Sequence, residues 1–256
     1  MGKLIIGIQM YTLRDFCKTR DEFVRTAEEI SKIGYRVVQP FCAVPIDAKE
    51  LKKILDDNGF YSCSTHVPYQ QIVDDTDNVI ETHKILGCEA IICPWLPEEV
   101  RNKEGYLKVA KGLEKTLPRI KKAGLKLGYH NHGFEFEKYE GKTGLEILLE
   151  NCKELEAEID TYWVQYGGGD PALWIEKYSG RVNEIHVKDM GIDKNKQVMP
   201  PIGTGNLNWD RIVTACKNSA VKYCLVEMDF TTINAFEAVK ISFENMKSWG
   251  MESKLQ

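Results

Sequence analysis

Short apolar stretches alternate with longer amphipathic segments along the whole chain. The apolar stretches carry few polar residues on either face, which is typical of parallel strands covered by helices. They predict strands over residues 4–10, 35–40, 61–67, 88–94, 125–132, 156–163, 182–188 and 223–229. In the intervening segments apolar residues recur at intervals of three and four, as on one face of a helix. These segments predict helices over residues 21–33, 48–58, 75–86, 98–123, 144–152, 171–178, 209–218 and 235–249.

Residues that favour helix termini occur at the ends of the predicted helices. In the first half of the chain, a glycine follows each predicted helix immediately before the next strand, as expected for a helix C-terminus. These glycines are Gly34, Gly59, Gly87 and Gly124. Asp47 and Asp170 are predicted N-caps, and Pro171 suits a first helical turn.

Eight strands alternating with eight helices in about 250 residues is the count of a (β/α)8 TIM barrel. We therefore predict an α/β fold with one barrel domain over residues 1–256. A doubly wound open sheet is the alternative. Its first strand would be followed by a glycine-rich fingerprint, whereas residues 7–11 read Gly-Ile-Gln-Met-Tyr. No stretch rich in proline or serine divides the chain.

Composition narrows the class of protein. The chain is 43% hydrophobic and 28% charged, as in an ordinary globular protein. Its net charge of −4 gives no electrostatic reason to expect nucleic acid or an anionic membrane as a partner. The eight cysteines are scattered without a CxxC pair, which favours reduced structural thiols. With no signal peptide or membrane-length apolar run, we expect a cytoplasmic protein, and a homo-oligomer is compatible with the sequence.

Four of the five histidines lie at the C-terminal ends of predicted strands, together with several carboxylates. The histidines are His66, His130, His132 and His186. In a parallel barrel these strand ends open onto one face, where the active site is built. Imidazole and carboxylate donors together suit a divalent metal ion such as Mn, Mg, Co or Zn.

The densest motif is GYHNHGFEF at residues 128–136. His130 and His132 share one face of a strand because alternate side chains do. Glu135 is the first choice as a metal ligand and proton acceptor, and His130 is the alternative ligand.

Three further strand ends supply candidate ligands. Asp160 is a predicted ligand, with a helix N-cap as the alternative, and His186 is a predicted ligand on the next strand. Glu227 would be costly to bury unless it were paired or bound to metal. Lys188 either polarises a substrate oxygen or forms a salt bridge with Asp189 or Asp229.

Other polar and aromatic residues are candidates for contact with a substrate. His66 is expected to contact hydroxyl groups, and Gln9, Tyr11 and Gln39 are candidates to line the pocket. Trp163 and Gln165 either stack on and hydrogen-bond a sugar or serve packing. In the loop at residues 200–209, Gly203 and Gly205 either hold a phosphate or shape the turn. His83, within a helix, is assigned to the surface or to packing.

Five motifs in order, HNHGFEF, IDTYWV, RVNEIHVKD, PIGTGNLNW and LVEMD, resemble the sugar phosphate isomerase/epimerase group of the xylose isomerase-like TIM barrels. The resemblance spans essentially the whole chain. It implies a divalent metal held by Glu135, Asp160, His186 and Glu227. Many relatives carry the first glutamate inside the fifth strand, where this chain has His130.

The resemblance also implies a reaction on a carbohydrate. A divalent metal bound by a hydroxy-carbonyl sugar stabilises an enediolate, and two carboxylates, Glu135 and Glu227, exchange protons with it. Catalytic roles are thus expected for Glu135, Glu227 and Lys188. We expect an isomerase or epimerase. A lyase of the inosose dehydratase or keto-glycoside-cleaving type is the first alternative, and a non-catalytic sugar-binding barrel the second.

Overall fold

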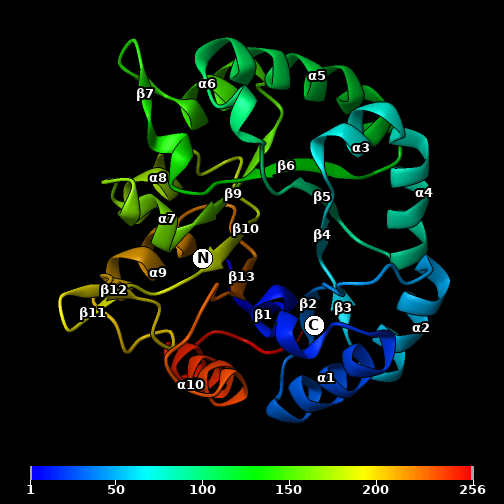
Figure 1. Ribbon diagram of the computed structural model, residues 1–256, viewed down its shortest axis with the longest axis vertical. Helices are drawn as coiled ribbons and strands as arrows, with labels where there is room; N and C mark the ends of the chain where they lie inside the picture. The colour runs from blue at the N-terminus through cyan, green and yellow to red at the C-terminus, as the bar shows by residue number, and fades with distance from the viewer. Residues whose placement is uncertain (1, 255–256) are drawn as a thin grey trace.

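The computed structural model describes residues 2–254, and its central feature is a parallel sheet that closes on itself (Figure 1). The order of strands is β3-β2-β1-β13-β10-β9-β6-β5-β4. Their bounds are β1 (Ile5–Gln9), β2 (Val37–Gln39), β3 (Tyr61–Ser62), β4 (Ser64–His66), β5 (Ala90–Cys93), β6 (Lys126–His130), β9 (Glu156–Asp160), β10 (Glu184–Val187) and β13 (Tyr223–Val226). The predicted barrel is confirmed.

The third predicted strand appears as two segments that meet at Cys63. The first segment, β3, pairs with β2, and the second, β4, pairs with β5. Cys63 itself bonds to both neighbours, because its N–H donates to Val38 and its carbonyl accepts from Ala90. The interruption therefore lies at the seam where the sheet closes, and β3 and β4 together complete an eight-strand ring.

Helices surround the barrel in a ring, as Figure 1 shows, at each position where the sequence predicts one. They are α1 (Arg20–Ile33), α2 (Ala48–Asp57), α4 (Thr76–Leu86), α5 (Lys103–Lys122), α6 (Gly144–Asn151), α8 (Pro171–Lys177), α9 (Trp209–Lys217) and α10 (Ala235–Ser248). Asp47 and Asp170 accept hydrogen bonds from the first backbone N–H groups of α2 and α8, so both predicted N-caps are confirmed. The four predicted terminating glycines all have positive φ.

Additional short elements follow the strands, and the sequence pattern did not predict them. They are η1 (Met10–Phe16), α3 (Tyr69–Asp74), η2 (Glu98–Val100), η3 (Phe134–Phe136), the hairpin β7 (Lys138–Tyr139) with β8 (Lys142–Thr143), α7 (Thr161–Tyr166), and the hairpin β11 (Gly191–Asp193) with β12 (Lys196–Val198). The strand predicted over 156–163 is therefore too long. It ends at Asp160, whose side chain caps α7 by accepting from the N–H of Trp163.

The apolar core has two parts, one outside and one inside the barrel. A large cluster fills the space between the strands and the helices. A smaller cluster inside the barrel consists of Ile5, Val37, Cys63, Tyr223 and Leu225. These residues lie at the beginning or middle of their strands, so the interior is apolar toward the N-terminal ends. The remaining interior, toward the C-terminal ends, is left to polar side chains.

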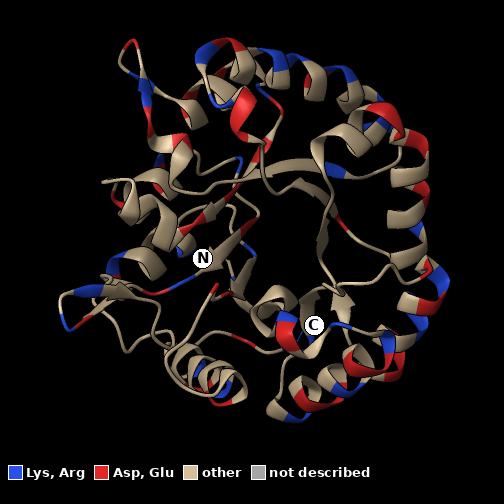
Figure 2. Cartoon of the chain, in the orientation of Figure 1, with Lys and Arg blue, Asp and Glu red and all other residues tan. Residues whose placement is uncertain are grey.

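Acidic and basic residues are interspersed over the outer helices and loops (Figure 2). Between residues 2 and 254, every helix is too short or too polar to cross a membrane. All eight cysteines are free thiols and seven are buried, which agrees with the structural role predicted for them.

Candidate active site

A cavity of about 480 Å³ opens above the C-terminal ends of the barrel strands. It is lined by Gln9, Tyr11, Pro40, Phe41, His66, Pro68, Pro94, Trp95, His130, His132, Glu227 and Asp229. Most of these residues end a strand or follow one directly, which is the position expected for a barrel active site. His66, His130, His132 and Glu227, all predicted at strand ends, are thus gathered around a common space.

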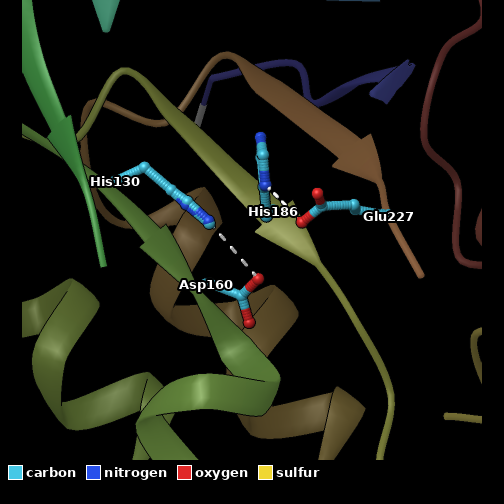
Figure 3. Close-up of side chains that lie close together, drawn as sticks. All are labelled: His130, Asp160, His186 and Glu227. Carbon is cyan, nitrogen blue, oxygen red and sulfur yellow. Dashed lines mark hydrogen bonds and ion pairs between the residues drawn. The ribbon is translucent and has the colours of Figure 1, made fainter. Parts of the chain in front are cut away.

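Four buried side chains form a possible metal centre at the floor of the cavity. His130 ends β6, Asp160 ends β9, His186 lies on β10, and Glu227 follows β13. One nitrogen or oxygen atom from each lies within 4.8 Å of the others. Figure 3 shows the four side chains pointing toward one another. Two imidazoles and two carboxylates are a donor set that Zn, Mn or Co accepts.

His130 has the properties expected of a metal ligand. It is buried, and neither ring nitrogen has a hydrogen-bond partner. Its Nε2 is 3.7 Å from Asp160 Oδ2, too far for a hydrogen bond. Burial and the nearby histidines hold the pKa of His130 well below its usual value, so the ring is neutral. A neutral imidazole with a free lone pair on one nitrogen is the form that binds metal.

His186, by contrast, is surrounded by oxygen atoms. Its Nδ1 lies 2.7 Å from Glu227 Oε2, and its Nε2 lies 2.9 Å from Gln39 Oε1 and 3.2 Å from Glu158 Oε2. Burial opposes the charged ring, but the two carboxylates raise the pKa of His186 well above its usual value. The proton on His186 thus balances the negative charge of these carboxylates, and a divalent cation bound in its place would balance the same charge.

Glu158 is a buried carboxylate that connects three histidines, and the sequence analysis did not single it out. Its Oε2 lies 2.8 Å from His66 Nε2, 3.2 Å from His186 Nε2 and 3.9 Å from His130 Nδ1. Its Oε1 accepts from the Gln39 amide at 2.8 Å. Burial alone would raise its pKa, but His186 and His66 lower it well below the usual value, so Glu158 is ionised.

Lys188 places a buried ammonium among the carboxylates. Its Nζ lies 3.0 Å from Asp160 Oδ2, 2.9 Å from Glu227 Oε2 and 2.7 Å from Asp229 Oδ2. The predicted salt bridge with Asp229 is thus present, whereas none forms with Asp189. Burial disfavours the charged amine, yet these carboxylates raise the pKa of Lys188. Burial raises the pKa of Asp160 to about 7 despite the ammonium.

Glu135, the first choice for a metal ligand, does not lie with these four residues. Its carboxylate accepts hydrogen bonds from the Tyr129 hydroxyl at 2.6 Å and from the His132 N–H at 2.8 Å. Tyr129 alternates with His130 along β6 and packs in the apolar layer under the helices. The short turn η3 therefore directs Glu135 to the outside of the barrel wall, and His130 takes the place expected for the first ligand. Burial raises the pKa of Glu135 to about 7.

The predicted substrate-binding residues separate into two groups. Gln9, His66, His130 and His132 line the cavity. Trp163 does not line the cavity but packs against His132, which does, and the centroids of the two rings lie 5.7 Å apart. Gln165 lines a different cleft, between α7, α8 and α9. Both residues belong to α7, which turns away from the strand direction on which their prediction rested.

The glycine-bearing loop at residues 200–209 binds a side chain of the chain itself. Asp189 Oδ2 accepts from the backbone N–H groups of Gly203 and Gly205, each at 2.9 Å, and from the Trp209 indole at 2.8 Å. Its Oδ1 accepts from Met190 N–H at 2.8 Å. Of the two roles considered for these glycines, the structure shows the turn.

One pattern in the sequence could have revealed more of the site. Glu158 alternates with Asp160, and Glu184 alternates with His186 and Lys188, so both glutamates face the barrel interior. Glu184 accepts from Ser64 at 2.8 Å, and burial and Glu158 raise its pKa to about 8.

Comparisons with known proteins agree with this architecture. Residues 27–249 match the sequence family of xylose isomerase-like TIM barrels. Inosose dehydratase of Clostridium perfringens is 25% identical over an alignment of 203 residues, with a coverage of 69% of this chain and 66% of that protein. The chain thus spans just under two thirds of that relative's length.

Solved structures show the same fold. A sugar phosphate isomerase/epimerase from Parabacteroides distasonis superposes with a TM-score of 0.78 at 24% identity, over 97% of this chain and 94% of the other. The IolI protein, whose crystal structure contains a bound zinc atom, superposes with a TM-score of 0.73 at 14% identity, over 96% and 97%. Because both identities are below 25%, these two likenesses concern the fold alone.

Proposed function

The chain belongs to the xylose isomerase-like TIM barrel family, and on that premise we propose that it is a divalent-metal-dependent enzyme that isomerises or epimerises a sugar or keto-sugar. The observation that carries the proposal is the buried group of His130, Asp160, His186 and Glu227 beneath a cavity of about 480 Å³. His130 supports a metal at this place, since its ring is buried, neutral and without a hydrogen-bond partner.

The side chains of His130, Asp160, His186 and Glu227 would hold the metal. When bound, a divalent ion supplies Lewis acidity that stabilises negative charge on the oxygens of a hydroxy-carbonyl sugar. The ammonium of Lys188, fixed between Asp160 and Glu227, adds a second positive charge at the floor of the cavity. Both features favour the removal of a proton from the carbon next to a carbonyl group.

His66 is well placed to take that proton. It lines the cavity, and its Nε2 donates a hydrogen bond to the ionised Glu158 at 2.8 Å. That bond fixes the tautomer and leaves Nδ1 as the basic nitrogen. Glu227 and Asp229 line the cavity from the strand β13. Return of that proton by His66 to the neighbouring carbon gives isomerisation, and delivery of a solvent proton to the opposite face of the same carbon, through the carboxylates of Glu227 and Asp229, gives epimerisation. Since Glu135 faces away, we assign its expected proton-transfer role to His66.

The test combines metal analysis with proton exchange. Protein purified without chelator should contain close to one equivalent of a divalent metal, and Asp160→Asn and His186→Ala should lose most of it. Incubation of the wild type with hexoses, pentoses and their keto forms in D2O should place deuterium on the carbon next to the carbonyl. Full metal content in both variants would contradict the ligand assignment. Metal without exchange on any sugar would favour the sugar-binding alternative.

A lyase is the second candidate, favoured by the match to inosose dehydratase. The first step would be the same: His66 removes the proton next to the carbonyl. The carbon–oxygen bond at the next carbon then breaks, and the departing oxygen takes the proton that His66 removed, so that water or an alcohol leaves. The product is an unsaturated ketone that absorbs in the ultraviolet. Its appearance without isomerised sugar would select this reaction over the first.

A further inference from the structure

We propose that the substrate is an uncharged carbohydrate in which the reacting sugar carries a second ring and no phosphate. This inference rests on the proposed function, because it takes the polar floor of the cavity as the place of the reacting sugar. It goes further by assigning the remainder of the cavity to a neighbouring group, such as a second sugar or an aromatic aglycone.

The cavity has two chemically different sides. The apolar side is built by residues that follow β1, β2, β4 and β5: Tyr11, Pro40, Phe41, Pro68, Pro94 and Trp95. The polar side contains the histidines and carboxylates of the floor. Tyr11 and Phe41 pack edge to face with ring centroids 4.9 Å apart, and three of the six apolar residues are prolines.

Trp95 extends the apolar side to the rim of the cavity. It is 48% exposed, although it lies next to buried residues in the sequence. The guanidinium of Arg101 stacks against it, 5.0 Å from the ring centroid, and against Phe134 at 3.7 Å. An indole held at the mouth of a pocket offers a flat apolar face, on which the C–H face of a sugar ring or an aryl group can pack. Together with the other apolar residues of this side, Trp95 therefore offers a surface on which a second ring can bind.

The volume of the cavity agrees with two rings. At about 30 Å³ for each water, 480 Å³ corresponds to about sixteen water molecules. Covalently bonded atoms lie closer together than separate waters, so the cavity accommodates more atoms than one hexose contains. A single sugar on the polar floor would leave the side formed by Phe41 and Trp95 without a partner.

The charges around the cavity disfavour a phosphate. No lysine or arginine is among its twelve lining residues. At the floor, the carboxylates of Asp160, Glu227 and Asp229 surround the single ammonium of Lys188, and a fourth carboxylate, that of Glu158, contacts His66. With a divalent cation in place of the proton on His186, these four carboxylates still exceed the positive charges by one, which repels a phosphate group.

The loop that holds phosphate in many barrels has its donors satisfied internally. The N–H groups of Gly203 and Gly205 both bind Asp189, and so does the Trp209 indole. A phosphate would have to displace this carboxylate and leave it buried without partners, which is costly. Two independent observations, the lining of the cavity and the occupied loop, therefore indicate an unphosphorylated substrate.

The experiment compares matched ligands of the metal-loaded protein by titration calorimetry and tryptophan fluorescence. The probes are glucose, galactose and mannose, with the 6-phosphate and the phenyl and glucosyl glycosides of each. We expect at least one phenyl or glucosyl glycoside to bind tenfold or more tightly than its free sugar, and no 6-phosphate to bind more tightly than its free sugar. Trp95→Ala should lower the affinity for that glycoside at least tenfold.

Phe230→Ala is the matched control, since Phe230 is an aromatic residue 47% exposed after β13 that does not line the cavity. It should bind the glycoside as the wild type does, and Phe41→Ala provides a second test if Trp95→Ala misfolds. A 6-phosphate that binds more tightly, or glycosides without any advantage, would overturn this proposal. Neither result touches the metal and proton-exchange tests, so a failure here is separable from a failure of the proposed function.

Discussion

Replacing Glu158 with glutamine removes one negative charge from beneath three histidines and keeps the shape of the side chain. In the wild type, Glu158 accepts from His66 at 2.8 Å and lies 3.2 Å from His186 Nε2. A glutamine amide retains one carbonyl acceptor for these rings and places a donor where the other carboxylate oxygen was. Because carboxylates behind metal-binding histidines fix the ring orientation and raise its basicity, metal affinity should fall.

The expected size follows from the role of Glu158 outside the ligand set. Loss of such a supporting carboxylate lowers metal affinity by about 10- to 100-fold, which corresponds to about 1.4–2.7 kcal/mol. The lower limit applies if the amide oxygen still orients His186. The upper limit applies if the amide rotates and presents its N–H groups to the imidazoles. Loss of one of the four proposed ligands, as in Asp160→Asn, should have a larger effect.

Affinity can be measured by competition with a chromophoric chelator for zinc, and the matched control is Glu184→Gln. Glu184 is also a buried glutamate in the barrel interior, but it bonds to Ser64 and Cys63 and makes no hydrogen bond to a histidine. Since burial raises its pKa to about 8, it is mostly neutral near pH 7, and glutamine there removes little charge. Glu184→Gln should keep the affinity of the wild type within a factor of three.

Two results would refute the reasoning. Zinc affinity in Glu158→Gln within a factor of two of the wild type would show that the carboxylate does not support the ligands. Equal losses in Glu158→Gln and Glu184→Gln would show a general response to altered interior polarity. Circular dichroism and urea unfolding of both variants establish whether each is folded before affinity is compared.

Three other predictions concern ligand identity, pH and packing. His130→Ala should lose most bound metal and Glu135→Gln should keep it, as metal analysis would show, and the reverse result would restore Glu135 as the ligand. Burial lowers the pKa of His83 from 6.5 to about 4, so the buried ring stays neutral where the unfolded chain would take up a proton. The contribution of His83 to stability is therefore fully present above pH 6.5 and is lost as the pH falls toward 4. When the pH is lowered from 7 to 5, the free energy of unfolding measured in urea should fall by about 2 kcal/mol more in the wild type than in His83→Gln. Equal losses in the two proteins would contradict the lowered pKa of His83. Gly128→Ala should destabilise the protein by about 1–3 kcal/mol in the same urea measurement, because the added Cβ would lie 2.6 Å from Ile92 Cδ1. Gly180→Ala is the control and should leave stability unchanged, since its Cβ would enter open space.

The fold could be predicted from the sequence because its signals are local and repeated. Apolar strands, amphipathic helices and terminating glycines alternate through the chain, and the number of strands distinguishes a closed barrel from other α/β folds. The short elements after the strands were not predictable in this way. Six residues, as in α3 or α7, are too few for a periodicity to emerge, and the cap formed by Asp160 is visible only once the strand is known to end there.

The candidate site could be predicted where a residue lies on a strand and not where it lies on a turn. His130, His186 and Asp160 converge because strand ends in a barrel meet. Glu135 belongs to the turn η3, and nothing in the order of residues shows that the turn faces the helices. The register of neighbouring strands determines which side chains of the site lie opposite each other, and β6 and β9 pair so that His130 lies opposite Glu158. That register depends on the whole closed ring, and a single strand does not reveal it.

The distribution of polarity inside the barrel explains how so many charges can be buried at one end. The interior near the N-terminal ends of the strands is closed by Val37, Tyr223 and Leu225, which exclude water from below. Above them, each buried charge has a partner of opposite sign: Glu158 faces His66 and His186, and Lys188 faces the carboxylates that end the neighbouring strands. Removal of one member would leave the others buried and unpaired, which costs far more than an exposed pair contributes. The neutral His130 makes no hydrogen bond through either ring nitrogen, so a bound cation would give this buried ring a partner.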